Sequence, residues 1–310
     1  MSKEHVNIYK GKGLKLKKNE TNNTKIFVFD LDETIGHFSE IYILFQFIQQ
    51  LHSSFSCTLF ENDKQCLFFL LDLFPQVFRY GIEIIFQYLH KKKTKNGKTM
   101  VYMYTNNSCI PITWTTYISE YIEQKWNVDG LFTNIVRAFK INGKIVEHKR
   151  TTGSKTYNEF LRCVQLPKNT ELCFLDNTDH VFMKHRYVYY VQPKPYYIDL
   201  SRNEIIGTFI DAFVEKCEKS ENIREELLSY YKRNDLIVND NKKMGEDILI
   251  DMKVSKKMLQ CIQKFYKYKM VKIYTRKKRS TVRNKTMKKK YFIILHLQDQ
   301  KLIWLRPRIS

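Results

Sequence analysis

The chain has 310 residues, a formal net charge of +21, 20 tyrosines and 21 phenylalanines, but only 10 glycines and 6 prolines. So many aromatic residues in a chain of this length exclude a disordered protein and predict one large domain or two small ones with a real core. The seven cysteines contain no CxxC pair and are odd in number, which argues against a disulfide framework and against a zinc site.

Residues 1–24 are polar and lysine-rich, with two glycines, and they predict a flexible basic arm. This composition is unlike that of a secretory signal, which needs an apolar stretch. Further along, the longest apolar runs, such as 66–74, are too short to cross a bilayer. We therefore expect an intracellular protein, cytoplasmic or nuclear, that is not secreted and does not contact a membrane.

Four apolar segments predict the strands of a buried sheet. Their apolar residues are continuous rather than alternating, as in strands that are covered on both faces. Segments with the helical spacing of apolar residues separate them, and strands that alternate with helices predict an α/β fold with a mostly parallel sheet. The expected strands are 25–30, 99–107, 171–180 and 187–193, and the expected helices are 40–52, 78–93, 112–126 and 156–166.

Polar residues end three of these strands, at 30–34, 105–107 and 176–179. Ligands of parallel α/β sheets bind beyond the carboxyl ends of the strands, so we expect these clusters to meet at one charged ligand site. The carboxylates of Asp30 and Asp32 need a compensating charge where they follow a buried strand. Two plainer interpretations stay open, which are a capping or turn role for this pair and an Asx-turn at Asp176 and Asn177.

Four motifs stand at or near these strand ends. They are DLDET at 30–34, an apolar strand ending in Thr105, a lysine before the last motif, and FLDN at 174–177. Together they resemble the haloacid-dehalogenase (HAD) superfamily. With the R-x-G at 79–81, DLDET and FLDN are similar to phosphatases that act on the C-terminal domain of RNA polymerase II, including the nuclear-LIM-interactor-interacting type.

The resemblance extends from about residue 25 to about residue 193. It implies a HAD-like, Rossmannoid α/β fold with a mostly parallel sheet and flanking helices. Only about 70 residues separate the first two motifs, which leaves no room for a large cap. In this superfamily, enzymes without large caps leave the site open to macromolecules.

A role for each matching residue follows from the resemblance. Asp30 would be the nucleophile that forms an aspartyl-phosphate, with Mg²⁺ relieving the repulsion between carboxylate and phosphate. Asp32 would protonate the leaving group and then take a proton from the attacking water. Thr34 would orient Asp30 through a hydrogen bond. Thr105 and Asn106 would bind phosphate oxygens.

Mg²⁺ is the expected cofactor, because the candidate ligands are oxygen atoms. The expected ligands are Asp30, Asp32 (through its backbone carbonyl), Asp176 and Asn177. Asp179 is expected to contact the metal ligands without binding the metal itself. His180 is expected to be a partly exposed loop histidine.

One lysine should neutralise the phosphoryl charge, as phosphoryl-transfer sites require. Lys155 lies 21 residues before Asp176 and just ahead of a predicted helix, whereas Lys149 would by default belong to a solvated basic turn. The sequence favours Lys155 as a catalytic and phosphate-binding residue, with Lys149 as the competitor.

Three parts of the chain are expected: the arm at 1–24, a HAD-like phosphatase domain at 25–200, and an extension at 201–310. The extension should begin with helices that either pack on the phosphatase domain or start a second unit, and it should then become basic, with a β-hairpin near its end. From Cys261 to Ser310 it holds sixteen basic residues and one acidic residue. Residues 264–290 therefore predict contact with a polyanion, either DNA or RNA or an acidic protein. The plainer interpretations of this stretch are a solvated linker and a nuclear-targeting patch.

The function expected from the motifs is that of a Mg²⁺-dependent phosphatase with an aspartyl-phosphate intermediate. The expected substrate is a protein phosphorylated on serine or threonine. One alternative is a 3′-phosphatase of nucleic-acid ends from the same superfamily. Another is a non-catalytic scaffold that binds nucleic acid or protein.

Overall fold

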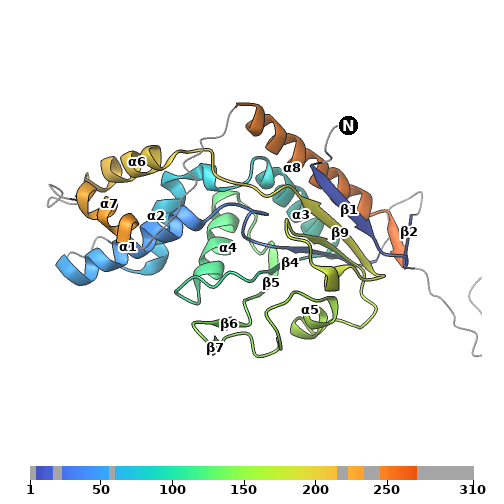
Figure 1. Cartoon of the computed structure of the whole chain (residues 1–310). Helices are drawn as coiled ribbons and strands as arrows, with labels where there is room; N and C mark the ends of the chain where they lie inside the picture. Colours follow the sequence, from blue (N-terminus) through green and yellow to red (C-terminus); the bar gives the residue numbers. More distant parts are fainter. Residues whose placement is uncertain (1–4, 17–22, 56–59, 215–222, 234–244, 271–310) are drawn as a thin grey trace, which may run out of the picture. The chain divides into compact units, whose positions relative to one another are not determined.

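A computed structural model describes residues 5–16, 23–55, 60–214, 223–233 and 245–270. Its main strands are β1 (Val6–Lys10), β3 (Lys25–Phe29), β4 (Thr99–Tyr104), β5 (Phe132–Val136), β8 (Leu172–Leu175) and β9 (Val188–Pro193). They form one sheet in the order β1-β9-β8-β3-β4-β5 (Figure 1). Every neighbouring pair is parallel except β1 and β9. The prediction of a mostly parallel sheet is confirmed.

Helices follow or connect these strands. They are α1 (Ser39–Phe55), α2 (Asp63–Leu73), α3 (Ile82–Asn96), α4 (Trp114–Lys125), α5 (Tyr157–Cys163), α6 (Arg202–Val214), α7 (Ile223–Arg233) and α8 (Gly245–Phe265). The smaller elements are two 3-10 turns, η1 (Pro75–Val77) and η2 (Val181–Met183), and two ribbons, β2 (Leu14–Leu16) with β10 (Tyr268–Met270) and β6 (Lys140–Ile141) with β7 (Lys144–Ile145). Among the described helices, none combines the length and the apolar composition that a membrane span needs.

Both faces of the sheet are covered by helices. Side chains alternate across a strand, so Phe27 and Phe29 of β3 point into one core and Ile26 and Val28 into another. The first core is shared with α3 and α8, and the second with α5. All five residues of β3 are buried, which explains the continuous apolar character of its sequence.

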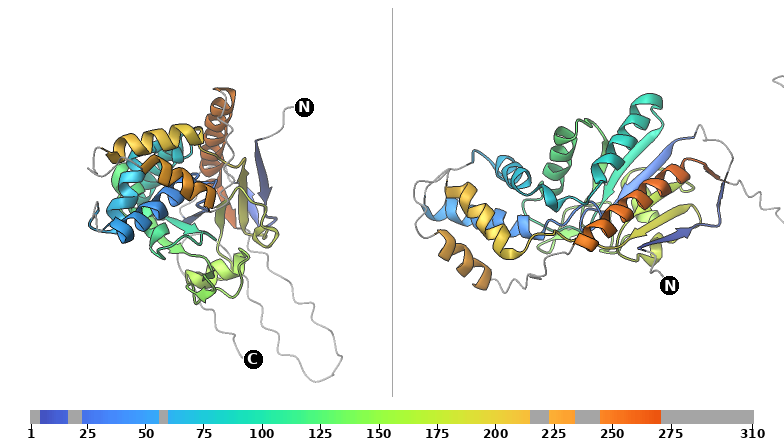
Figure 2. Two further views of the ribbon diagram at one scale, coloured as in Figure 1. Left: turned by 60° about the vertical axis from the view of Figure 1, so that its left-hand side comes forward. Right: turned by 90° about the horizontal axis from the view of Figure 1, so that it is seen from above.

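Helices from both ends of the chain gather beside the sheet. Figures 1 and 2 show α1 and α2 side by side with α6 and α7. Phe47 of α1 makes edge-to-face ring contacts with Phe209 of α6 and Tyr230 of α7, at centroid distances of 6.1 and 5.6 Å. Tyr231 of α7 donates a hydrogen bond to Glu40 of α1 at 3.2 Å. This helical group belongs to the same continuous core as the sheet and is not a separate domain.

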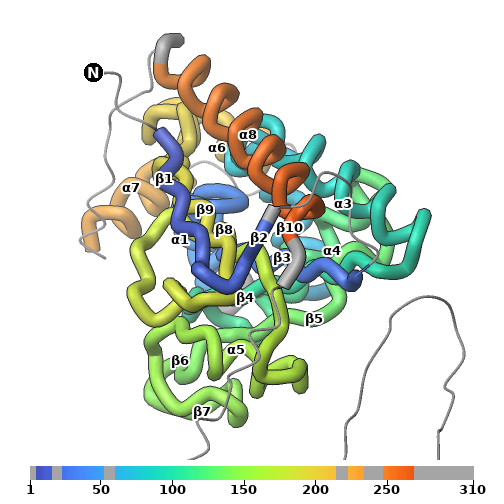
Figure 3. The backbone as a smooth tube through the Cα atoms, turned by 90° about the vertical axis from the view of Figure 1, so that its right-hand side faces the viewer, coloured from blue at the N-terminus to red at the C-terminus, as the bar shows by residue number. Residues whose placement is uncertain are grey.

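The prediction of a flexible N-terminal arm is wrong for residues 6–16. β1 pairs with β9 along its whole length, from Val6 opposite Pro193 to Lys10 opposite Tyr189 (Figure 3). The two glycines of the supposed arm allow the chain to approach the turn before β9 closely. A Cβ atom on Gly11 or Gly13 would lie 2.4 or 2.7 Å from the backbone oxygen of Arg186. The glycines therefore mark a tight contact, not flexibility.

A boundary near residue 200 is also corrected, because helices beyond it belong to the core of the sheet. Phe209 of α6 and Met258 and Phe265 of α8 are completely buried in that core. Phe265 contacts the ring of Phe27 edge to face at 5.5 Å between centroids. The chain instead divides into units 1–271 and 272–310. The second unit, with the expected hairpin and the basic stretch 276–290, lies outside the described residues.

Deleting residues 1–10 should destabilise the protein, because it removes β1 and exposes the edge of β9. The loss of the ladder hydrogen bonds and of buried Val6 should lower the free energy of unfolding by about 2 kcal/mol. Urea unfolding measures this change, and deletion of residues 1–4 alone is the matched control. Equal unfolding midpoints for the two deletions would contradict the role of β1.

Candidate active site

The carboxyl ends of three neighbouring strands meet at one edge of the sheet. Asp30 follows β3, Thr105 follows β4, and Asp176 follows β8. Backbone hydrogen bonds between the strands extend to these residues. The N–H of Asp30 donates to the carbonyl of Leu175 at 2.9 Å, and the N–H of Thr105 donates to the carbonyl of Val136 at 3.0 Å. The three polar clusters of the sequence therefore do converge, as their places at strand ends predict.

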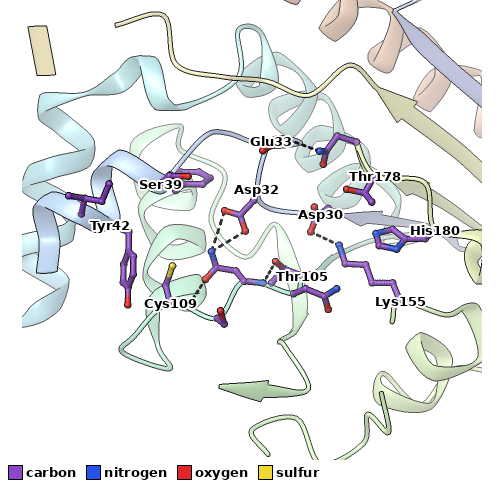
Figure 4. A pocket seen from close by; sticks show the side chains of 16 residues that line it. Asp30, Asp32, Glu33, Ser39, Tyr42, Thr105, Cys109, Lys155, Thr178 and His180 are labelled. Carbon is purple, nitrogen blue, oxygen red and sulfur yellow. Dashed lines mark hydrogen bonds and ion pairs between the residues drawn. The ribbon is translucent and has the colours of Figure 1, made fainter. Parts of the chain in front are cut away.

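A cavity of about 600 Å³ lies at this edge (Figure 4). It is lined by every expected catalytic and phosphate-binding residue, together with Asn177. Its lining residues are Asp30, Asp32, Glu33, Phe38, Ser39, Tyr42, Ile43, Thr105, Asn106, Asn107, Ser108, Cys109, Lys155, Asn177, Thr178 and His180.

Arg79 holds the loop that carries Asp30 and Asp32. Its guanidinium is buried and donates hydrogen bonds to the carbonyls of Glu33 at 2.5 Å and Thr34 at 2.6 Å. Glu33 has a φ of +57°, a left-handed conformation that non-glycine residues rarely adopt. The loop is thus tightly turned, and the arginine of the R-x-G motif fixes it from behind.

Lys155 bridges two of the carboxylates. Its Nζ donates to Oδ1 of Asp30 at 2.5 Å and to Oδ2 of Asp176 at 2.7 Å. Burial alone would lower the pKa of Lys155, but the two carboxylates outweigh this effect and raise it. Lys149 instead lies near the carbonyl of Cys163, at 3.4 Å. Of the two competing lysines, the structure places Lys155 at the strand ends.

Asp32 is held by a residue that the sequence did not single out. Nδ2 of Asn107 lies 3.2 and 3.0 Å from the two carboxylate oxygens of Asp32. The hydroxyl of Thr105 in turn accepts the backbone N–H of Asn107 at 2.9 Å. Burial raises the pKa of Asp32, although the hydrogen bonds from Asn107 oppose the shift. The signal was present, since Asn107 belongs to the polar cluster at 105–107.

Thr34 does not contact Asp30, so this expectation is corrected. Its hydroxyl donates to Oδ1 of Asn177 at 3.0 Å and lies 2.9 Å from the backbone nitrogen of the same residue, whose N–H it accepts. Nδ2 of Asn177 donates to Glu33 at 3.0 Å. Thr34 therefore fixes the orientation of the Asn177 amide, because the loop at 30–36 folds back toward the end of β8.

Of these two neighbours, His180 is a partly exposed loop histidine as expected, whereas Asp179 differs from its expectation. Asp179 is half exposed, pairs with Lys184 at 2.7 Å and does not line the cavity, so it does not support the metal site as expected. His180 lines the cavity, with Nε2 3.1 Å from Oδ2 of Asp176, and only 17% of its side chain is exposed. The tight turn after Asp176 points one side chain inward and its neighbour outward, which the sequence alone does not reveal.

The chemistry of this edge fits a divalent cation. The carboxylates of Asp30 and Asp176 pair with Lys155, and the carboxylate of Asp32 lines the same cavity as Asp30 and Lys155. Burial and the two neighbouring carboxylates raise the pKa of Asp30 to about 7, although Lys155 opposes the shift. A further positive charge would stabilise the ionised carboxylate.

The donor set also suits Mg²⁺, which prefers oxygen ligands and retains several waters. Among the described residues, no group of three or more His, Cys, Asp or Glu side chains is arranged to hold a metal ion. The expected Mg²⁺ ligands do not require such a group, because they are two carboxylates, the amide oxygen of Asn177 and a backbone carbonyl.

Comparison with models of protein families finds no match to this chain, and neither does a search of curated proteins.

Proposed function

We propose that this protein is a Mg²⁺-dependent phosphatase of the HAD type that forms an aspartyl-phosphate on Asp30. Its proposed substrate is a protein phosphorylated on serine or threonine. The observation that carries the proposal is the meeting of Asp30, Asp32, Thr105 and Lys155, from three separate segments of the chain, around one cavity. The resemblance of DLDET and FLDN to RNA polymerase II C-terminal-domain phosphatases supports it further.

In the first step, a carboxylate oxygen of Asp30 attacks phosphorus, and the bond from phosphorus to the substrate oxygen breaks. Asp32 gives its proton to that leaving oxygen. In the second step a water attacks phosphorus, Asp32 takes back a proton, and the bond from phosphorus to Asp30 breaks. The products are inorganic phosphate, the dephosphorylated hydroxyl and the original carboxylate of Asp30.

The other residues of the cavity bind and orient the phosphoryl group. Lys155 supplies positive charge beside the attacking oxygen. The Thr105 hydroxyl and the amide groups near Asn106, which line the cavity, would donate to phosphoryl oxygens. Asp30, Asp176, Asn177 and the carbonyl of Asp32 would hold Mg²⁺. When bound, the ion neutralises the charge that the phosphate dianion brings to Asp30.

Replacing Asn177 by alanine should weaken the binding of Mg²⁺ about tenfold while leaving the fold intact. The reason is that the amide oxygen is a proposed ligand and Thr34 fixes its orientation. The measurement is the Mg²⁺ concentration that gives half-maximal activity. Thr34→Val is the companion variant, which should show a smaller change of the same sign. An unchanged Mg²⁺ requirement in Asn177→Ala would exclude this residue as a ligand.

The experiment that tests the function compares two substrates with and without Mg²⁺. A phosphoserine peptide and a 3′-phosphorylated oligonucleotide are incubated with the full chain, and released phosphate is measured. We expect Mg²⁺-dependent release from the peptide that EDTA abolishes. Release from the oligonucleotide alone would favour the nucleic-acid alternative, and no release from either would favour a non-catalytic scaffold.

A further inference from the structure

The cavity has two chemically different ends. One end holds Asp30, Lys155, Thr178 and His180, which are charged or polar. The other end holds apolar side chains from α1, from the residue before it and from the loop after β4, with two serine hydroxyls among them. In Figure 4, Ser39, Tyr42 and Cys109 lie on one side of Asp32, and Lys155 and His180 lie on the other. We call the side of Ser39, Tyr42 and Cys109 the apolar end; it also comprises the lining residues next to them in sequence, Phe38, Ile43 and Ser108.

Two aromatic rings of the apolar end are held by contacts within the protein. The hydroxyl of Tyr42 accepts hydrogen bonds from the N–H of Ile110 at 3.1 Å and from the side chain of Gln46 at 2.9 Å. The ring of Tyr42 packs edge to face on buried Trp114, with 5.2 Å between centroids and an angle of 77°. Phe38 packs in the same way on Phe78, at 5.5 Å. These contacts hold two aromatic rings in place, so little conformational entropy is lost when a ligand meets them.

The position of Asp32 determines which end of the cavity receives the leaving group. Its carboxylate, held by Asn107, lies between the two ends of the cavity. A proton donor must lie within hydrogen-bond distance of the leaving oxygen. With phosphorus at Asp30, the atoms bonded to that oxygen therefore extend past Asp32 toward Tyr42 and Ile43.

A phosphoserine places one methylene group and then peptide N–H and C=O groups in this position. Peptide groups held against an apolar wall lose hydrogen bonds to water, which costs free energy. An aromatic ring instead buries apolar surface and can make an edge-to-face contact with Tyr42, which is partly exposed. The whole cavity, at about 600 Å³, falls within the range of sites that enclose a small molecule.

We propose that the apolar end of the cavity binds the aromatic ring of an aryl phosphate monoester, with phosphotyrosine in a polypeptide as a further substrate. This inference rests on the proposed phosphatase function and extends its substrate class beyond phosphoserine and phosphothreonine. Asp30 forms a bond to phosphorus, the bond from phosphorus to the phenolic oxygen breaks, and Asp32 transfers its proton to that oxygen. Water then releases phosphate from Asp30, as in the general mechanism.

The test uses two peptides of one sequence that carry either phosphotyrosine or phosphoserine, and it measures kcat/KM for each with Mg²⁺. A phenol is intrinsically the better leaving group, so the informative quantity is the change in the ratio of the two values between variants. Tyr42→Leu removes an aromatic wall, and Ser108→Trp fills the apolar end from an exposed position. Each should lower kcat/KM for phosphotyrosine about tenfold and change the phosphoserine value less than about twofold.

Ile84→Trp is the matched control, because Ile84 is an exposed residue of α3 outside the cavity. Thermal unfolding midpoints show whether each variant folds, and Ser108→Trp keeps the test decisive if Tyr42→Leu does not. Equal losses for both peptides, or no loss for phosphotyrosine in Ser108→Trp, would overturn the aryl site while leaving the phosphatase function in place. A wild-type protein that hydrolyses neither peptide overturns both proposals.

Discussion

Asp30→Asn should abolish phosphatase activity, with a loss of about 10⁴-fold or more in kcat. An amide has nearly the shape of a carboxylate but is not a nucleophile, so no aspartyl-phosphate can form. The fold should persist, because Lys155 keeps its second carboxylate partner, Asp176, at 2.7 Å. Phosphate release from a phosphopeptide measures the activity, and near-ultraviolet circular dichroism measures the packing.

The matched control is Asp179→Asn, which makes the same substitution at a half-exposed aspartate outside the cavity. It should leave kcat unchanged. Beryllium fluoride with Mg²⁺, which mimics a phosphoryl group on an aspartate, should inhibit the wild type and the Asp179 variant alike. Normal turnover by Asp30→Asn would exclude covalent catalysis at this residue.

The second large effect is expected from Lys155→Met. The substitution removes the cation that lies between Asp30 and Asp176, both of which are buried. Breaking a buried ion pair from one side typically costs about 3–5 kcal/mol, because the remaining charges stay unpaired. The loss of positive charge at the phosphoryl site should lower kcat by about 100- to 1,000-fold. Urea unfolding in EDTA and initial rates in saturating Mg²⁺ measure the two effects separately.

Lys149→Met is the control for this prediction, since the sequence alone allows either lysine. Lys149 lies near a backbone carbonyl, and its loss should leave stability and turnover nearly unchanged. Mg²⁺ should restore part of the stability of Lys155→Met, because the ion supplies positive charge to the same carboxylates. The reverse pattern, with activity lost only in Lys149→Met, would assign the catalytic role to Lys149.

The sheet was predictable because the sequence of each inner strand is recognisable by itself. β3, β4 and β8 are buried on both faces, so each has a continuous apolar sequence, and β3 was placed to within one residue. β1 was missed because an edge strand has no such signal. Among its residues only Val6 is buried, and its partner β9 lies far along the chain.

The site was predictable to the extent that its residues directly follow strands. Asp30, Thr105 and Asp176 needed only the rule that strand ends converge. The contacts of Asn107 with Asp32 and of His180 with Asp176 were not predicted, because they depend on how a loop turns after its strand. Local sequence does not determine that path, which contacts distant in sequence select.

The pairing of β1 with β9 has a consequence for synthesis of the chain. Val6 is synthesised long before Pro193, its partner in the antiparallel pair of strands, so β1 cannot pair until β9 has been synthesised. The same delay applies to the loop that carries Asp30 and Asp32, because Arg79, which holds it, also donates to the carbonyl of Lys194, at 2.8 Å. The face of β3 that contacts Phe265 stays uncovered for longer still. A nascent chain therefore exposes apolar surface of the sheet until Phe265 has emerged, which favours slow, late closure of the core.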